Sequence, residues 1–165
     1  MQGIEISGYY PGVVGKITET HAVYYHKNWG FDVSFETQVG RELSEFVSRF
    51  NEEQDGLWTA TRNGEFAGAI AIDGQDAFAA GARLRWFIVV PEYQKGGIGK
   101  ALILQAVNFC KSNGFPKVYL WTFEGLDGAR KLYEAAEFRL CEENIETQWG
   151  QTIKEQKFEL TLAGG

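Results

Sequence analysis

The sequence is poor in what secretion and membrane insertion require. It has two cysteines and three prolines among 165 residues, and no apolar run approaches the ~20 residues that cross a bilayer. The first residues, Met1–Glu5, lack the basic start and apolar stretch of a secretory signal. We therefore predict a cytoplasmic protein without membrane association, in which Cys110 and Cys141 are two buried thiols rather than a disulfide.

Positive charge and histidine are scarce as well. The 16 Lys and Arg against 22 Asp and Glu leave a formal net charge of −6, which argues against wide contact with the phosphates of nucleic acid. The two histidines, His21 and His26, lack the four-residue spacing that would align them on one helical face, and no cluster of Cys or carboxylates joins them. We expect this chain on its own to bind neither nucleic acid nor a metal ion.

What the chain does have is enough apolar material for a folded core. Hydrophobic residues make up 44% of the sequence and aromatic residues 15%, which excludes a disordered chain. No internal repeat, low-complexity segment or composition break divides the sequence. We therefore predict a single domain over residues 1–165.

A glycine-rich turn joins a predicted apolar strand, Arg83–Val90, to a predicted helix, Gly97–Ser112. Glycines let a backbone approach a ligand closely, and the free N–H groups at a helix start carry the positive end of the helix dipole. The pattern predicts an anion site suited to a diphosphate. The turn consists of Gln94, Lys95, Gly96, Gly97, Ile98, Gly99 and Lys100.

Two other phosphate motifs fit this turn less well. A nucleotide P-loop needs a Gly where Gln94 stands and a Ser or Thr where Ala101 stands. The dinucleotide fingerprint needs a third Gly at Leu102 and an acidic residue about twenty residues on, where the chain has Lys117–Tyr119. An ordinary glycine turn capping a helix remains an alternative.

Periodicity and turn residues predict the remaining elements. The predicted strands are Gly12–Lys16, Leu57–Thr61, Glu65–Ile72, Arg83–Val90, Lys117–Thr122, Phe138–Ile145 and Ile153–Leu162. The predicted helices are Ile17–Trp29, Phe35–Phe50, Gly97–Ser112 and Ala129–Ala136, the last with Asp127 as its N-cap. Residues 163–165 are predicted to form a frayed tail.

The turn and the last helix together resemble the GNAT acyltransferase superfamily. The pattern Gln-x-x-Gly-x-Gly is similar to its coenzyme A diphosphate loop, and Ala-x-x-Leu-Tyr-Glu-x-x-x-Phe, from Ala129 to Phe138, is similar to its following helix. Nearly the whole chain resembles the acetyltransferase half of proteins in which a MarR-type winged-helix domain precedes a GNAT domain. That resemblance is carried by His21–Tyr25, Trp29-Gly30, Phe35-Glu36, Leu120–Thr122, Gln148–Gly150 and Gln156–Leu160. No winged-helix domain is expected here.

This resemblance implies an α/β (α+β) fold, with one mixed, mostly antiparallel twisted sheet of about six or seven strands and about four flanking helices. It implies an N-acetyltransferase that transfers the acetyl group of acetyl-CoA directly to a primary amine. The acceptor is then a small molecule, a peptide amino terminus or a lysine side chain. The resemblance also allows a homodimer.

The resemblance assigns roles to particular residues. The backbone of the strand before the loop pairs with the pantetheine arm, and the N–H of Val89 faces the thioester carbonyl. Tyr133 is the general acid that protonates the departing thiolate, because a phenol with a pKa of about 10 is protonated at neutral pH; a buried core tyrosine is the alternative. Cofactor binding is assigned to Phe87, Ile88, Val89, Gln94, Lys95, Gly96, Gly97, Ile98, Gly99 and Lys100.

Several positions depart from the family pattern. Leu126 replaces a frequent Asn, and Glu137 replaces the usual Gly, which puts the backbone geometry of that turn in doubt. Where members often place a glutamate base, the chain has Arg85, Phe87 and Trp121. We therefore assign no base, although Glu124 is close enough in sequence to act through a water.

The acceptor pocket implied by the resemblance is lined by His21, Tyr25, Trp29, Arg85 and Trp121. Simple helix packing is the alternative for the aromatic residues of the first helix. Two other functions stay open. One is an acyl-CoA-sensing module that acts through a protein partner, and the other is a flavin or nicotinamide enzyme that uses the same glycines.

Overall fold

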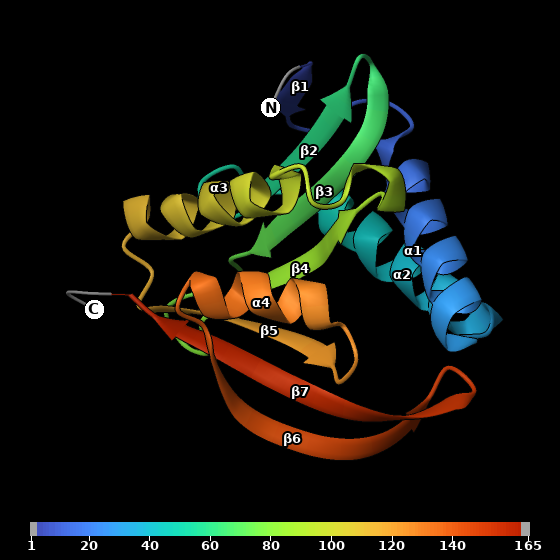
Figure 1. The fold of residues 1–165 in the computed structure, drawn as a ribbon. Helices are drawn as coiled ribbons and strands as arrows, with labels where there is room; N and C mark the ends of the chain where they lie inside the picture. Colours follow the sequence, from blue (N-terminus) through green and yellow to red (C-terminus); the bar gives the residue numbers. More distant parts are fainter. Residues whose placement is uncertain (1–2, 163–165) are drawn as a thin grey trace.

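The computed structural model describes residues 3–162, which form one seven-stranded sheet with α-helices on both faces (Figure 1). The strands are β1 Ile4–Ser7, β2 Gly56–Arg62, β3 Glu65–Asp73, β4 Ala82–Val89, β5 Lys117–Phe123, β6 Arg139–Gln148 and β7 Gln151–Thr161. The helices are α1 Val13–Trp29, α2 Val33–Ser48, α3 Ile98–Ser112 and α4 Asp127–Ala135, with a short 3₁₀ turn, η1, at Pro91–Tyr93. The predicted mixed α/β architecture is confirmed.

The sheet order is β1-β2-β3-β4-β5-β7-β6, and all neighbours are antiparallel except β4 and β5. Helices α3 and α4 cover one face, where Leu102, Ala106 and Tyr133 join the main core. Helices α1 and α2 cover the other face of β2–β4, as Figure 1 shows. Within residues 3–162, none of the helices is both long and apolar enough to span a bilayer.

The predicted strand at Gly12–Lys16 is wrong. Helix α1 already begins at Val13, and the first strand is Ile4–Ser7. The two β-branched residues at the start of α1 favour a strand locally, but buried Val13, Ile17 and His21 follow one another at four-residue spacing. Burial of that helical stripe against the sheet outweighs local β propensity.

Two smaller predictions also need correction. Asp127 is the first residue of α4 rather than its cap; the N-cap is Leu126, which makes no side-chain capping bond. Cys110 is a buried free thiol, whose pKa burial raises to about 12, but the free thiol of Cys141 is exposed on β6. Strand β6 is exposed on both faces over most of its length. A residue on this strand is therefore not necessarily buried. The predicted tail at 163–165 lies outside the described residues.

Asp55 holds together the turns next to β2 and β3. Its side chain is fully buried, and its carboxylate accepts hydrogen bonds from the backbone N–H of Asn51 at 3.0 Å and of Gly74 at 2.9 Å, with Arg49 at 3.7 Å. Asp55→Ala should lower the free energy of unfolding by about 2–4 kcal/mol, because the buried N–H of Gly74 and the part-buried N–H of Asn51 lose their acceptor. Urea unfolding measures this loss. A loss no larger than that of exposed Asp76→Ala would contradict the prediction.

Candidate active site

The site begins where the sheet splits. Strands β4 and β5 pair only through Ala82 with Val118 and Arg83 with Tyr119. Beyond Arg83, β4 stays paired with β3 and β5 stays paired with β7, so β4 and β5 separate (Figure 1). A bulge in β4 accompanies the split, since the register with β3 shifts by one residue and Trp86 has a left-handed φ of 49°.

The split leaves backbone groups of β4 without a strand partner. The N–H of Val90 donates to the carbonyl of Ala67 on the β3 side at 2.8 Å. Alternation along an antiparallel strand therefore turns the N–H groups of Val89 and Phe87 toward β5, which has moved away. The carbonyl of Val89 accepts a hydrogen bond from the side-chain amide of Gln94 at 3.1 Å. The Val89 N–H is thus directed away from β3, toward the split.

The glycine-rich turn lies at the open end of this split. After η1, Gly97 caps α3 with a left-handed φ of 87°, and Gly96 is exposed with 3.5 Å between an added Cβ and the nearest carbonyl. Gly99 has a different role, because its Cβ would lie 2.8 Å from Leu132 of α4. Gly96 and Gly97 therefore leave the N-terminus of α3 open to an anion, whereas Gly99 lets α3 and α4 pack closely.

Positive charge gathers at the same turn. Lys95 and Lys100 are exposed on either side of Gly97. The guanidinium of Arg62, on β2, lies 5.7 Å from the ring centre of Tyr93 in η1. Arg62 was not predicted from the sequence, because the hairpin that carries it lies more than thirty residues before the turn.

A cavity of about 430 Å³ lies between the split and helices α1, α2 and α4. Its walls come from seven elements, α1, α2, α4, β4, β5, β6 and β7, and from the β6–β7 turn. Four of the five predicted acceptor-site residues line it, namely His21, Tyr25, Arg85 and Trp121. Trp29 is not among the lining residues and packs instead against Phe123, at 5.4 Å between ring centres.

Tyr133 reaches this cavity from α4. Its ring packs 5.9 Å from Phe87 and 6.0 Å from Phe158 between ring centres. Burial, and then the neighbouring phenol of Tyr25, raise the pKa of Tyr133, so the hydroxyl stays protonated at neutral pH. No side chain or backbone group within residues 3–162 accepts its proton in a hydrogen bond, and its oxygen is not sealed from the cavity.

His21 and Tyr25 reach the cavity from the opposite side, on α1. Their rings are stacked with centres 6.0 Å apart. The Nδ1 of buried His21 donates to the carbonyl of Ile17 at 2.8 Å, which places the remaining lone pair on Nε2. Burial lowers the pKa of His21 to about 4, so the ring is neutral at pH 7. Burial, and then Tyr24, raise the pKa of Tyr25, which is therefore also protonated.

The charged residues of the cavity are largely paired. The Arg85 guanidinium forms an ion pair with Glu42 on α2, lies 3.7 Å from Asp73 and stacks 4.2 Å from the ring centre of Trp86. Glu155 on β7 accepts a hydrogen bond from the side chain of Gln148 at 3.0 Å. Arg85 is thus anchored within the wall by protein groups.

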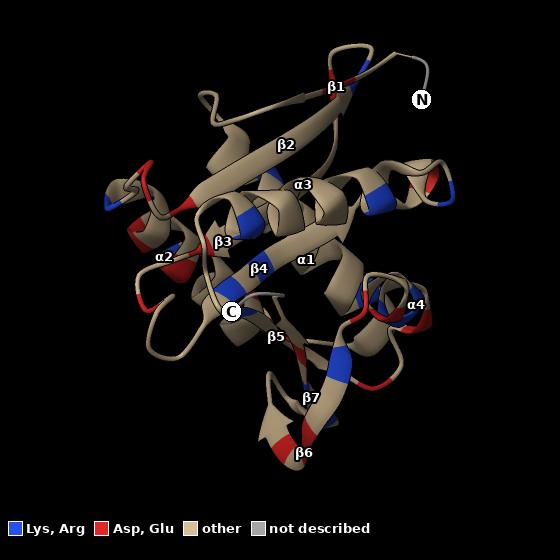
Figure 2. Cartoon of the chain, turned by 90° about the vertical axis from the view of Figure 1, so that its left-hand side faces the viewer, with Lys and Arg blue, Asp and Glu red and all other residues tan. Residues whose placement is uncertain are grey.

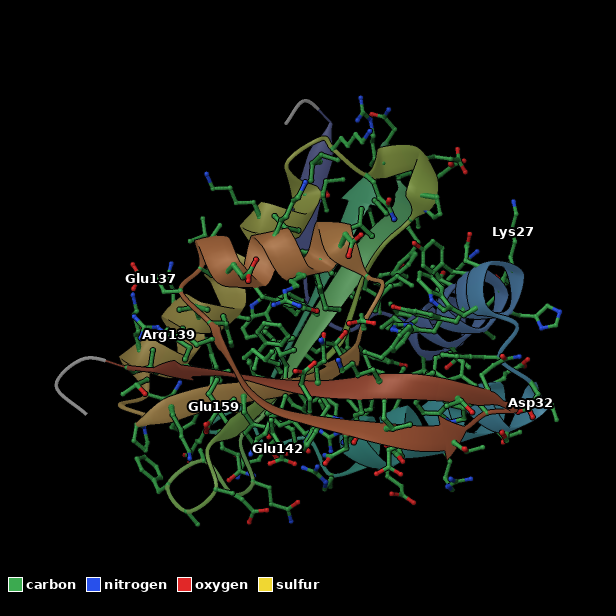
Figure 3. All side chains as sticks on the ribbon, turned by 60° about the horizontal axis from the view of Figure 1, so that its bottom comes forward. Lys27, Asp32, Glu137, Arg139, Glu142 and Glu159 are labelled. Carbon is green, nitrogen blue, oxygen red and sulfur yellow. The ribbon has the colours of Figure 1, made fainter. Side chains whose placement is uncertain are left out.

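The β6–β7 turn closes one end of the cavity against the α1–α2 connection. The backbone N–H of Asp32 donates to the carbonyl of Trp149 at 3.0 Å, and the Trp149 indole donates to Gln38 at 2.9 Å. Figure 3 shows Asp32 at the end of the long β6–β7 hairpin. Sequence reasoning gave Trp149 no role in the site, although Gln148–Gly150 was among the motifs of the resemblance.

The structure shows the backbone conformation or the contacts of each position that departs from the family pattern. Glu137 adopts a left-handed φ of 76°, so the turn keeps the conformation that a glycine would favour. Leu126 lines the cavity with an apolar side chain. Glu124 is exposed, lies 3.9 Å from the amine of Lys154 and is not among the lining residues. The part of the chain described contains no cluster of three His, Cys, Asp or Glu side chains arranged for a metal.

On the face that carries α3 and α4, the coloured positions on α3 and β4 are basic, whereas α4 carries both acidic and basic positions (Figure 2). Positive charge on this face is therefore not confined to the glycine turn, although the net charge of the sequence is −6.

Comparison with known proteins identifies the fold and the family. The model of the acetyltransferase (GNAT) family matches residues 18–138, while a comparison with curated protein sequences gave no significant match. YncA of Salmonella typhimurium, solved with its cofactor acetyl-CoA, has a TM-score of 0.75 and 15% identity over 99% of this chain and 96% of its own.

Two ribosomal-protein acetyltransferases share the same fold. The ribosomal-protein-alanine N-acetyltransferase of Brucella melitensis has a TM-score of 0.74 and 13% identity over 96% of this chain and 99% of its own. The ribosomal-protein-S18-alanine N-acetyltransferase of Escherichia coli has a TM-score of 0.69 and 19% identity over 98% and 96%. With the family model matching most of the sequence, this chain belongs to the acetyltransferase (GNAT) family.

Proposed function

We infer that the protein is an acetyl-CoA-dependent N-acetyltransferase that acetylates a primary amine by direct attack. The observation that carries this inference is the split between β4 and β5, which runs from the glycine turn of α3 to the cavity beside Tyr133. The fold shared with YncA, which was solved with acetyl-CoA, supports the same cofactor.

The residues around the split suit acetyl-CoA. The N–H groups of Phe87 and Val89 that are turned toward the split can pair with the amides of an extended pantetheine arm, as a neighbouring strand would. Gly96 and Gly97 expose the N-terminus of α3 to the diphosphate, with Lys95 and Lys100 adding positive charge. When bound, the cofactor supplies an acetyl group activated as a thioester.

The remaining chemistry falls to the protein. The N–H of Val89 is directed into the split, where it can hold a thioester carbonyl and stabilise negative charge on its oxygen. Tyr133 can donate its proton to the departing sulfur. A cofactor in the split and an amine in the cavity would displace water, so the thioester would meet few competing nucleophiles.

The test is an acetylation assay on a panel of acceptors: small alkyl and aryl amines, peptides with a free amino terminus and lysine peptides with a blocked amino terminus. Released thiol gives the rate, and mass spectrometry shows which nitrogen gains the acetyl group. We expect transfer to at least one class. Acetyl-CoA binding by calorimetry without transfer to any class would favour the acyl-CoA-binding module. A homodimer and a cytoplasmic location remain predictions.

A further inference from the structure

We propose that His21 accepts the proton of the attacking amine, as one end of a row of proton-handling groups, His21, Tyr25 and Tyr133, that crosses the cavity. This inference rests on the proposed N-acetyltransferase function and adds the base that the sequence does not reveal at the positions where relatives often place a glutamate.

The surroundings of His21 fix which ring atom can act. Its Nδ1–H is held by the Ile17 carbonyl one helical turn earlier, at 2.8 Å. Its Nε2 has no hydrogen-bond partner among residues 3–162 and is not sealed by its neighbours, while the residue lines the cavity. A lone pair held on a rigid helix and open to the site is the arrangement that a proton acceptor needs.

Tyr25 connects His21 to the opposite wall. Its ring stacks on His21 from the same helix, and Tyr25 and Tyr133 both line the cavity, from α1 and α4 respectively. The row therefore spans the cavity beside Phe87, whose ring lies 5.9 Å from that of Tyr133. Attack at one end and departure of the sulfur at the other would both occur within reach of this row.

Other candidate bases in the wall are engaged elsewhere. Glu42 is paired with Arg85, and Glu155 accepts a hydrogen bond from Gln148. Both carboxylates are thereby held by their own neighbours. His21 also lines the cavity, and its Nε2 has no such partner in the described part of the chain.

The proposed step balances in atoms and charge. The amine nitrogen forms a bond to the acetyl carbon, the carbon–sulfur bond breaks, and the sulfur takes the hydroxyl proton of Tyr133. The nitrogen gives one proton to Nε2 of His21. Transfer of a proton from the imidazolium to the Tyr133 phenolate, through the Tyr25 hydroxyl or through water, restores both residues and leaves an amide and a thiol.

The low basicity of His21 is compatible with this role. Burial lowers its pKa to about 4, which keeps the ring unprotonated and ready to accept at neutral pH. The amine nitrogen becomes far more acidic once it has bonded to the acetyl carbon, so even a weak base can remove its proton at that stage.

The test compares His21→Asn with His26→Asn. Asparagine at position 21 can still donate to the Ile17 carbonyl but lacks the ε nitrogen. The control, His26, lies on the same helix and also bonds a backbone carbonyl, that of Phe31 at 2.9 Å, but does not line the cavity. We expect kcat to fall about a hundredfold in His21→Asn, with acetyl-CoA affinity and melting temperature unchanged. In His26→Asn we expect all three quantities to stay unchanged. Equal kcat in both variants would overturn the proposal.

A second variant separates proton transfer from packing. In His21→Ala, added imidazole should restore part of the lost rate in a saturable manner, and no rescue by imidazole in a folded variant would refute the role. Nitrogen NMR of the native protein should show His21 protonated at Nδ1 alone, and a proton on Nε2 at neutral pH would overturn the proposal independently of turnover. Absence of acetyl transfer by the native protein would refute the proposed function itself, even where the NMR result is as expected.

Discussion

Tyr133→Phe is expected to lower kcat about a thousandfold while acetyl-CoA affinity stays within about twofold. The substitution removes the hydroxyl that faces the cavity but keeps the ring that packs on Phe87 and Phe158. Without that proton the sulfur must leave as a thiolate. The substitution should therefore lower kcat and leave acetyl-CoA affinity nearly unchanged. Thiol release at saturating acceptor gives kcat, and calorimetry gives the affinity.

The matched control for this prediction is Tyr119→Phe. Tyr119 is a half-buried tyrosine on β5 that carries Lys157 over its ring at 4.9 Å and does not line the cavity. Tyr25→Phe should have an intermediate effect, since Tyr25 joins the two ends of the row without meeting the sulfur. Unchanged turnover in Tyr133→Phe, under conditions where chemistry limits the rate, would exclude Tyr133 as the acid.

Gly96→Glu is expected to weaken acetyl-CoA binding about a hundredfold. Two like charges 4 Å apart repel by about 1 kcal/mol in water and about 4 kcal/mol near a protein surface, and the exposed glycine turn lies between these limits. Gly96 does not have a left-handed φ, and an added Cβ finds ordinary contact distances. The variant should therefore fold normally and lose only the cofactor, as calorimetry would show.

Two further variants separate charge from bulk. Gly96→Gln places the same volume at the turn without the charge and should bind the cofactor better than Gly96→Glu. Gly15→Glu adds the same charge on α1, where an added Cβ meets open space, and should bind normally. Gly97 is a poorer choice, because its φ of 87° would strain any side chain. Equal binding by the native protein and Gly96→Glu would remove the turn as the diphosphate site.

The parts of the fold that could be predicted are those specified by nearby residues. The helix predicted at Gly97–Ser112 is observed at Ile98–Ser112, because its apolar stripe and its glycine cap lie within one segment. The strand pair around Asn63-Gly64 is observed as β2 and β3 for the same reason. The family resemblance then implied one mixed, mostly antiparallel sheet, which no local pattern could have fixed; the order of its strands was not predicted.

The remaining features depend on groups that meet only after folding. The left-handed bulge at Trp86 has no glycine to mark it, and the pairing of Glu42 with Arg85 joins α2 to β4. Tyr25 and Tyr133 are far apart in the sequence, so their approach across the cavity could not be inferred from spacing. The sequence named His21 as an acceptor-site residue, but only the fold shows which of its nitrogens is free.

The split between β4 and β5 also has a mechanical consequence. The strands β1–β4 form one continuous antiparallel half of the sheet, and β5–β7 form the other. The two halves are joined only by the two residue pairs between β4 and β5. A strand-like ligand lying in the split would bond to both edges and bridge the halves as an extra rung. The cofactor would then stabilise the sheet only while it is bound. The junction of β4 and β5 should be the part of the sheet whose local opening depends most on whether the ligand is bound.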